Sequence, residues 1–151
     1  MIEVDDPRRD DIRRLLEEHG RFAGSVMPPE EVHVLDRENS IDADVTFFSV
    51  RGNGELLGIG AIKQLDADHA ELKSMHTAIA ARRRGVGRAL LDHLVAVAVA
   101  RGVRRVSLET GAGEAFEPAR SLYAAAGFVP CEPFGVYVQT PSNAFMTRLL
   151  G

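Results

Sequence analysis

The sequence predicts a mixed α/β (α+β) domain in which a central sheet of about seven strands is flanked by about four helices. The length of 151 residues is that of one domain, so residues 1–151 are expected to fold as a single unit. Apolar residues make up 45% and charged residues 26% of the chain, which is typical of a soluble globular protein with an ordinary core. The spacing of apolar residues also changes repeatedly between the period of a strand and that of a helix.

A strand and then two helices are predicted before the first long strand. Asp6 and Pro7 have the residue types of a helix N-cap and a first helical position, and a helical apolar pattern follows as far as Gly20, which we expect to end the helix. That pattern consists of Ile12, Leu15, Leu16 and His19. A second, shorter helix is predicted from Pro29-Glu30 onward.

Three successive strands are predicted in the middle of the chain. Residues 45–50 and 55–62 are rich in β-branched, aromatic and aliphatic side chains, and Gly52-Asn53-Gly54 between them supplies the positive φ angles of a tight hairpin. A third run, 70–76, follows the polar turn 66–68. These runs indicate an antiparallel meander.

Helices and strands alternate in the remaining residues. Apolar residues keep helical spacing from Gly87 to Arg101, and Gly102 ends this longest helix. A shorter helix is predicted from Pro118 to Ala126 and is closed by Gly127. Strands are expected at 106–108, from Phe128-Val129 onward, and at 145–150. The predicted order is strand, two helices, three strands, helix, strand, helix and two strands.

Charge and cysteine content exclude several classes of protein. Eighteen basic and 22 acidic side chains give a net charge of −4, which argues against binding nucleic acid through bulk charge. Cys131 is the single cysteine, and no Cys/His cluster has zinc spacing, so we expect no metal and a reducing, cytoplasmic setting. The acidic amino terminus and the short apolar run 94–100 indicate neither export nor a membrane span.

A basic, glycine-containing turn precedes the longest predicted helix. It consists of Arg82, Arg83, Arg84, Gly85, Val86, Gly87 and Arg88. The two glycines let a ligand approach the backbone, while the N–H groups and positive dipole end of the first helical turn face it, so we predict an anion site. The spacing matches neither a P-loop nor a dinucleotide-binding fingerprint. A turn with solvated arginines and no ligand is the alternative.

Two motifs resemble the signatures of one family. Residues 82–87 fit Gln/Arg-x-x-Gly-x-Gly/Ala, and residues 119–128 fit Ala-x-x-Leu-Tyr-x-x-x-Gly-Phe, each in its expected element. In both respects the chain is similar to the GCN5-related N-acetyltransferases (GNAT), and it looks like a bacterial member. The resemblance covers about residues 45–150, and it implies a mostly antiparallel sheet and acetyl-CoA as cosubstrate.

The resemblance also implies which residues bind the cosubstrate. The backbone amides of the 82–88 turn would hold its pyrophosphate. The strand end formed by Met75, His76 and Thr77 would contact the remainder of the acetyl-CoA molecule. The backbone of Met75 and Thr77 would hold the pantetheine arm and place an N–H against the thioester oxygen. Phe116 stands where many members carry Asn, so one pantetheine contact is expected to be lost or supplied otherwise.

Tyr123 and Glu71 are the candidate catalytic residues. By resemblance, Tyr123 would give a proton to the leaving thiolate, and a tyrosine that only packs in the core is the alternative. Glu71 is the candidate base, because it stands eleven residues before Arg82, as the catalytic glutamate does in the histone-modifying members. Lys73 points to the same face of the strand and would weaken that base, so a structural Glu71–Lys73 pair stays open.

His76 is the reserve candidate for the base. Simple alternation along the strand places it on the face opposite Glu71, unless a β-bulge re-aims it. An unpaired surface histidine is the expectation otherwise.

The acceptor pocket is predicted between the last two strands, where residues 131–143 are rich in turn formers. Glu109 and Glu114 suit a cationic acceptor, although a solvated acidic loop is an equal alternative. Cys131 is interpreted as a small buried apolar residue, because no His/Asp partnership can be assigned to it.

The predicted function is direct transfer of the acetyl group of acetyl-CoA to a primary amine of a small molecule or peptide, without an acyl-enzyme. A homodimer is common among similar proteins and is expected on that ground alone. A non-catalytic module that binds coenzyme A or another anion is the alternative, and the presence of both Tyr123 and Glu71 favours the enzyme. Nucleic-acid binding through residues 82–88 is disfavoured by the acidic net charge.

Overall fold

The computed structural model describes residues 1–26, 44–135 and 137–150. The elements are β1 (Ile2–Val4), α1 (Asp10–Val26), β2 (Val45–Gly52), β3 (Glu55–Gln64), β4 (His69–Thr77), α2 (Val86–Ala100), β5 (Arg105–Gly111), α3 (Glu117–Ala125), β6 (Val129–Pro130) and β7 (Asn143–Leu149). Single 3₁₀ turns at Ile79–Ala81 and Glu114–Phe116 precede α2 and α3. The order agrees with the prediction, except that the helix expected from Pro29 lies outside the described residues.

In the described part of the chain, seven strands form one sheet in the order β1-β2-β3-β4-β5-β7-β6. Every neighbouring pair is antiparallel except β4 and β5, which are parallel. The predicted mixed, mostly antiparallel sheet is therefore confirmed. The hairpin between β2 and β3 turns through Asn53 and Gly54, whose φ angles are 53° and 81°.

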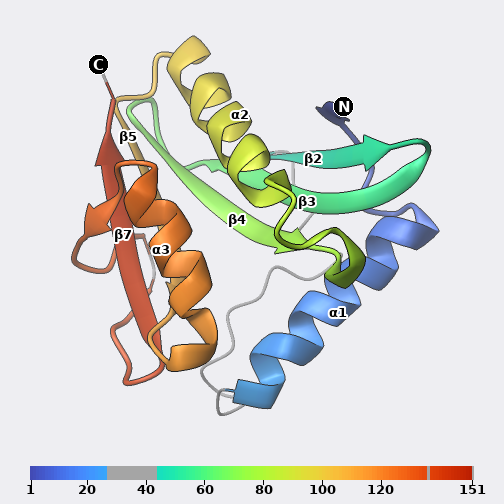
Figure 1. Cartoon of the computed structure of the whole chain (residues 1–151). Coiled ribbons are helices and arrows are strands. Elements are labelled where there is room, and N and C mark those ends of the chain that lie inside the picture. Colours follow the sequence, from blue (N-terminus) through green and yellow to red (C-terminus); the bar gives the residue numbers. More distant parts are fainter. Residues whose placement is uncertain (27–43, 136, 151) are drawn as a thin grey trace.

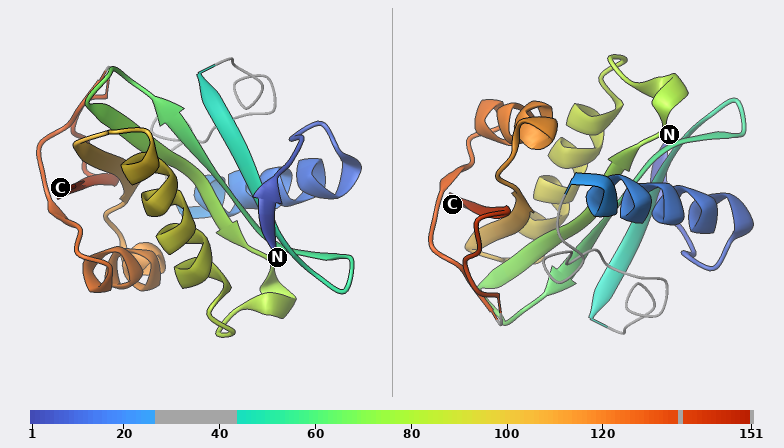
Figure 2. Two further views of the ribbon diagram at one scale, coloured as in Figure 1. Left: turned by 90° about the horizontal axis from the view of Figure 1, so that it is seen from above. Right: turned by 90° about the horizontal axis from the view of Figure 1, so that it is seen from below.

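The helices cover both faces of this sheet. α1 lies against one face, and α2 and α3 lie against the other (Figure 1, Figure 2). The larger apolar core joins α2 and α3 to the sheet, with Leu90, Leu91 and Leu94 of α2 at most 1% exposed. A smaller core joins Ile12 and Leu16 of α1 to the opposite face.

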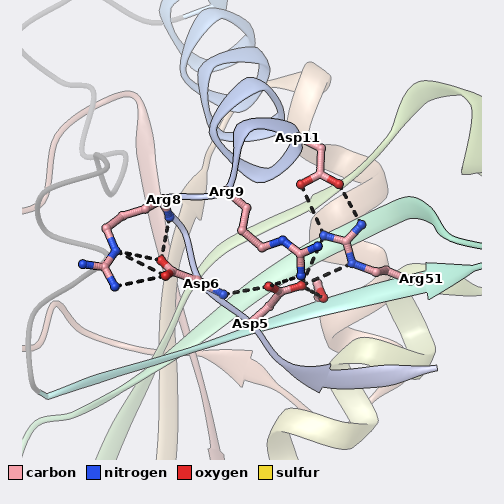
Figure 3. Close-up of polar contacts among 7 residues, drawn as sticks. Asp5, Asp6, Arg8, Arg9, Asp11 and Arg51 are labelled. Atoms are coloured by element: carbon pink, nitrogen blue, oxygen red, sulfur yellow. Dashed lines mark hydrogen bonds and ion pairs between the residues drawn. The ribbon is translucent and has the colours of Figure 1, made fainter.

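A polar network fixes the start of α1 against β2 (Figure 3). The Arg51 guanidinium bonds Asp11 in the first turn of α1, with Nη1 2.7 Å from Oδ2, and its Nη2 lies 3.3 Å from Oδ2 of Asp5. Asp5 also accepts a hydrogen bond from Ser49 of β2. These contacts anchor the helix whose later turns reach the cavity described below.

α1 differs from its predicted bounds at both ends. It begins three residues later, because Asp6 accepts a 2.8 Å hydrogen bond from the Arg8 N–H and closes a turn before the helix. Gly20 does not end it. A helix tolerates an interior glycine at a cost of about 1 kcal/mol, and beyond it Phe22 packs on Phe116 with ring centroids 5.2 Å apart.

A β-bulge interrupts β4 at Ser74, whose φ is 56°. Lys73 pairs with Ala61 and His76 pairs with Ile59, so two residues of β4, Ser74 and Met75, stand opposite Gly60 alone. The extra residue reverses the alternation beyond it. Leu72 and Met75 both pack toward the α2 core, and His76 faces α1.

β4 and β5 separate at the same level. Their pairing ends at Leu72 and Leu108, although β4 continues to Thr77 and β5 continues to Gly111. In Figure 1, β4 runs toward α1, whereas β7, the strand paired with β5, runs beside α3. The sheet is therefore open between its two halves beyond this level.

Candidate active site

A cavity of about 710 Å³ occupies the opening between β4 and β5. Its wall is formed by the ends of these strands, the first turn of α2, one side of α3, and His19 and Phe22 of α1. Residues far apart in the sequence therefore line one pocket, which is partly open to solvent. Both predicted halves of the site, the basic turn and the two candidate catalytic side chains, line it.

The basic turn presents backbone N–H groups to the cavity. Gly85 precedes α2 with a φ of 77°, and the first main-chain bond of the helix runs from the Ala89 N–H to the Gly85 oxygen. The N–H groups of Val86, Gly87 and Arg88 thus have no partner within the helix, and no side chain of the described residues caps it. Anions are stabilised at such a helix start by the N–H groups and by the dipole.

Gly87 lies where three elements meet. A Cβ atom at this position would be 3.3 Å from Leu122 Cδ2 of α3 and 3.6 Å from Thr77 Oγ1 of β4. A side chain here would therefore press on α3. The contact holds the N-terminal turn of α2 beside both β4 and α3.

Most of the predicted binding residues lie in the cavity wall. Met75, His76, Thr77, Arg82, Arg83, Gly85, Val86, Gly87 and Arg88 line it, whereas Arg84 is exposed and does not. Arg83 has a φ of 64°, which a side-chain-bearing residue adopts only at a cost. Arg88 pairs with Asp92 one helical turn later, at 3.0 Å. Exposed arginines thus stand on both sides of Gly85 in the chain.

Tyr123 lies both in the apolar core and in the cavity wall. It is 7% exposed and belongs to the core, where its ring centroid lies 6.1 Å from that of Phe128. It also lines the cavity. Burial raises the pKa of Tyr123 to about 12, so the phenol is protonated at neutral pH.

Glu71 is held by a lysine and by a tyrosine that the sequence analysis did not single out. Tyr137 donates a 2.6 Å hydrogen bond to Glu71 Oε2, and Lys73 Nζ lies 3.3 Å from the same oxygen. Lys73 also donates a 2.6 Å hydrogen bond to the Tyr137 oxygen, which closes a triangle. The Glu71–Lys73 pair that the sequence left open is thus formed, while Glu71 Oε1 has no hydrogen-bond partner among the described residues.

The environment of Tyr137 keeps it a donor. Burial raises the pKa of Tyr137 above its usual value, and the adjacent Glu71 carboxylate raises it further. The only signal in the sequence was that it lies in the segment 131–143, predicted to wall the acceptor pocket.

His76 is neither unpaired nor on the surface, so that expectation is wrong. It is 9% exposed, its Nε2 lies 3.1 Å from Glu18 Oε1, and its Nδ1 lies 3.1 Å from His19 Nδ1. The bulge at Ser74 turns it to the face of β4 that carries Glu71. Glu71, His76 and His19 therefore all line the same cavity.

The two acidic residues predicted to suit a cationic acceptor differ in position: Glu109 lies within β5, and Glu114 follows that strand. Glu109 lines the cavity and accepts a 3.0 Å hydrogen bond from Asn143, whereas Glu114 is exposed and outside the wall. Phe116, at the position where the resemblance led us to expect a lost pantetheine contact, also lines the cavity. Cys131 is only half-buried and lies outside the wall, and partial burial raises the pKa of its thiol.

Two further findings bear on function. Within the described ranges, no group of three His, Cys, Asp or Glu side chains is arranged to hold a metal ion. None of the described helices has the length and apolar character needed to span a membrane.

Comparison with known proteins identifies relatives along the whole chain. Residues 10–128 match the model of the Acetyltransferase (GNAT) family. The chain is 42% identical to YsnE of Bacillus subtilis (strain 168), named an uncharacterized N-acetyltransferase, over 99% of both chains.

Solved structures share the fold. The chain matches a Klebsiella pneumoniae structure with a TM-score of 0.82 and 23% identity, covering 100% of this chain and 97% of that one. It also matches a GNAT family acetyltransferase of Elizabethkingia anophelis, solved with acetyl-CoA bound, with a TM-score of 0.73 and 16% identity over 99% and 97% of the two chains.

Proposed function

This chain belongs to the Acetyltransferase (GNAT) family, and we propose that it transfers the acetyl group of acetyl-CoA directly to a primary amine of a small molecule or peptide. One observation carries the proposal. A single cavity connects the unpartnered amides at the start of α2 with a buried protonated phenol and a carboxylate. Binding an anion alone would require only the first of these.

The start of α2 suits the phosphate end of acetyl-CoA. The N–H groups of Val86, Gly87 and Arg88 supply donors, and Arg82 and Arg83 supply charge at the cavity wall. Charge-assisted hydrogen bonds of this kind contribute about 1.5 to 3 kcal/mol each. The pantetheine arm would then run between β4 and α3, beside Thr77 and toward Tyr123.

The separated strands suit the thioester. Beyond Leu72, the edge of β4 that faces β5 has no strand partner among the described residues. This unpaired edge supports the proposal that backbone groups of Met75 and Thr77 bond the pantetheine arm. In this proposal a backbone N–H of that strand end donates to the thioester oxygen and stabilises the charge that develops there.

Tyr123 and Glu71 would carry the proton transfers. The amine nitrogen attacks the thioester carbon, so a C–N bond forms and the C–S bond breaks. Tyr123 gives its phenolic proton to the departing sulfur, and Glu71 takes one proton from the nitrogen through a water. Proton exchange with solvent then restores both side chains, and the products are the acetylated amine and coenzyme A as its thiol.

Thermal unfolding with acetyl-CoA, coenzyme A and ATP at matched ionic strength tests binding. A ligand at 100 times its Kd stabilises the protein by about 2.7 kcal/mol, or several degrees in Tm. We expect both coenzyme forms, and not ATP, to raise Tm. No shift with either at millimolar concentration would refute the proposed ligand.

Thiol release from acetyl-CoA with a panel of amines tests turnover. We expect release that depends on the amine and follows sequential rather than ping-pong kinetics. Binding of acetyl-CoA without thiol release for any amine would instead support a module that only binds coenzyme A.

A further inference from the structure

We propose that His19 is a second catalytic base, which takes the extra proton of a protonated acceptor amine before the amine attacks, and that His76 and Glu18 hold it in the basic tautomer. This role rests on the proposed amine acetylation. An alkylamine is an ammonium ion at neutral pH and must lose one proton before attack and another afterwards. Glu71 accounts for only one of the two.

The three side chains form a continuous chain of short contacts. Glu18 Oε1 lies 3.1 Å from His76 Nε2, and His76 Nδ1 lies 3.1 Å from His19 Nδ1. The two imidazole centroids are 4.9 Å apart. Glu18 and His19 are neighbours on α1, and the β4 bulge brings His76 to them from the sheet.

The contacts determine where the protons lie. A carboxylate can only accept, so His76 carries its proton on Nε2 and donates it to Glu18. His76 Nδ1 is then an acceptor, and His19 must donate its Nδ1 proton to it. This leaves the lone pair of His19 on Nε2, which has no hydrogen-bond partner among the described residues.

That free nitrogen belongs to a side chain of the cavity wall. His19 and His76 both line the cavity that holds Glu71 and Tyr123. Glu18, by contrast, lies 32% exposed in a separate surface groove between α1 and the β2–β3 turn. The chain of contacts therefore runs from the cavity to solvent.

The electrostatics favour a neutral imidazole at the cavity. Burial lowers the pKa of His19 to about 4, with a smaller contribution from His76. Burial also lowers the pKa of His76, an effect that Arg82 reinforces and Glu18 opposes. Both rings are therefore uncharged at neutral pH. The low pKa also makes His19 by itself a weak base toward an ammonium ion, so the transfer depends on the proton moving on through His76 to the Glu18 carboxylate.

The proton transfer balances. The ammonium N–H bond breaks and an Nε2–H bond forms on His19. The Nδ1 proton of His19 moves to His76 Nδ1, and the Nε2 proton of His76 moves to Glu18, so the positive charge is neutralised at the carboxylate. After the product leaves, the reverse movement returns the proton through His19 to solvent in the cavity.

NMR of the ring nitrogens tests the tautomers without any substrate, and so independently of the proposed function. In the protein at pH 7 we expect the proton on Nδ1 of His19 and on Nε2 of His76, and Glu18→Gln should disturb this pattern while Glu17→Gln should not. Glu17 is the matched control, because it is the adjacent carboxylate, 50% exposed and paired with Arg13. A proton on Nε2 of His19 in the unliganded protein would overturn the proposal.

Kinetics with two kinds of nucleophile test the base. His19→Gln should lower kcat/KM for alkylamines such as benzylamine by about 100-fold, with recovery at high pH, and leave unprotonated nucleophiles such as aniline or hydroxylamine little changed. Glu18→Gln should follow the same pattern more weakly.

An equal loss for both kinds of nucleophile would mean that His19 only supports the fold, and unchanged alkylamine rates would refute its role as a base. Absence of turnover by the wild-type protein with every nucleophile would instead refute the proposed function, and NMR would still decide the tautomers.

Discussion

The hydroxyl of Tyr137 donates a 2.6 Å hydrogen bond to the carboxylate of Glu71, a residue 66 positions earlier in the chain. The bond connects the segment before β7 to the last residues of β4 that pair with β5, at the opening between the two halves of the sheet. Because Lys73 contacts both groups, the carboxylate is held by two donors on one oxygen and leaves the other for the cavity.

Tyr137→Phe should impair the acceptor side of the site and spare the coenzyme side. The variant removes the donor to Glu71 and the acceptor of Lys73, both in a partly buried setting, and should cost about 1.5 to 3 kcal/mol of unfolding free energy. KM for the amine should rise or kcat fall, with Kd for coenzyme A unchanged by calorimetry. A wild-type rate and stability would show that the triangle contributes nothing.

Tyr123→Phe should lower turnover without unfolding the protein. Phenylalanine fills the same buried position, so Tm and Kd for acetyl-CoA should stay close to wild type, while kcat falls by about 100-fold or more. Because burial raises the pKa of Tyr123 to about 12, ionisation of this phenol should cause no loss of wild-type activity below about pH 10. An undiminished kcat in the variant would remove the proposed acid.

Gly85→Ala should weaken the binding of coenzyme A more than the matched substitution Gly54→Ala. Gly85 and Gly54 have φ angles of 77° and 81°, and a Cβ at either would meet nothing within 4 Å. Each alanine should therefore lower the free energy of unfolding by a similar amount, about 1 to 2 kcal/mol, through backbone strain. Only Gly85 adjoins the free amides, so coenzyme A titrations should show a raised Kd for Gly85→Ala and a wild-type Kd for Gly54→Ala.

The network in Figure 3 should make stability fall in acid. Hydrogen bonding to Arg51 lowers the pKa of Asp11. Burial alone would raise the pKa of Asp5, but hydrogen bonds led by that from Ser49 outweigh it and lower the pKa. Carboxylates with lowered pKa values stabilise the fold above their unfolded pKa, near pH 4, and lose this contribution as the pH falls through the folded values.

Arg51→Met isolates that contribution. Urea unfolding at pH 7 should show a loss of about 1 to 3 kcal/mol, and the difference from wild type should shrink toward pH 2 as the carboxylates protonate. A difference independent of pH would assign the loss to packing. Arg8→Met is a control, because Arg8 pairs with Asp6 on the surface at 63% exposure and should change stability little.

Local signals in the sequence were sufficient for the strands, the turns and the basic loop. The β2–β3 hairpin, the start of α2 at Val86 and the end of α3 before Gly127 all follow from nearby glycines and apolar spacing. These features depend on contacts close in sequence, which periodicity and turn chemistry describe.

Features that depend on distant contacts were not predictable. The sequence around Ser74 contains no signal for a bulge. The bulge goes with close packing on the opposite strand at Gly60, where a Cβ would lie 2.7 Å from Met75 Sδ. Strict alternation of side chains along β4 therefore predicted the wrong face of the sheet for His76. The contact between Tyr137 and Glu71 depends on the conformation of the loop before β7, which the sequence does not indicate. Likewise, α1 continues past Gly20, and there Phe22 packs on the distant Phe116.

The bulge also determines how the chain tolerates changes of length. Deleting one residue of β4 between Glu71 and His76 would restore plain alternation and turn His76 into the apolar layer beneath α2, away from Glu18 and His19. Substitutions at Ser74 leave the residue count, and hence the orientation of His76, unchanged. We expect length in this strand to be more tightly constrained than residue identity at the bulge, whereas the β2–β3 turn at Gly54 can gain residues at little cost to the cavity.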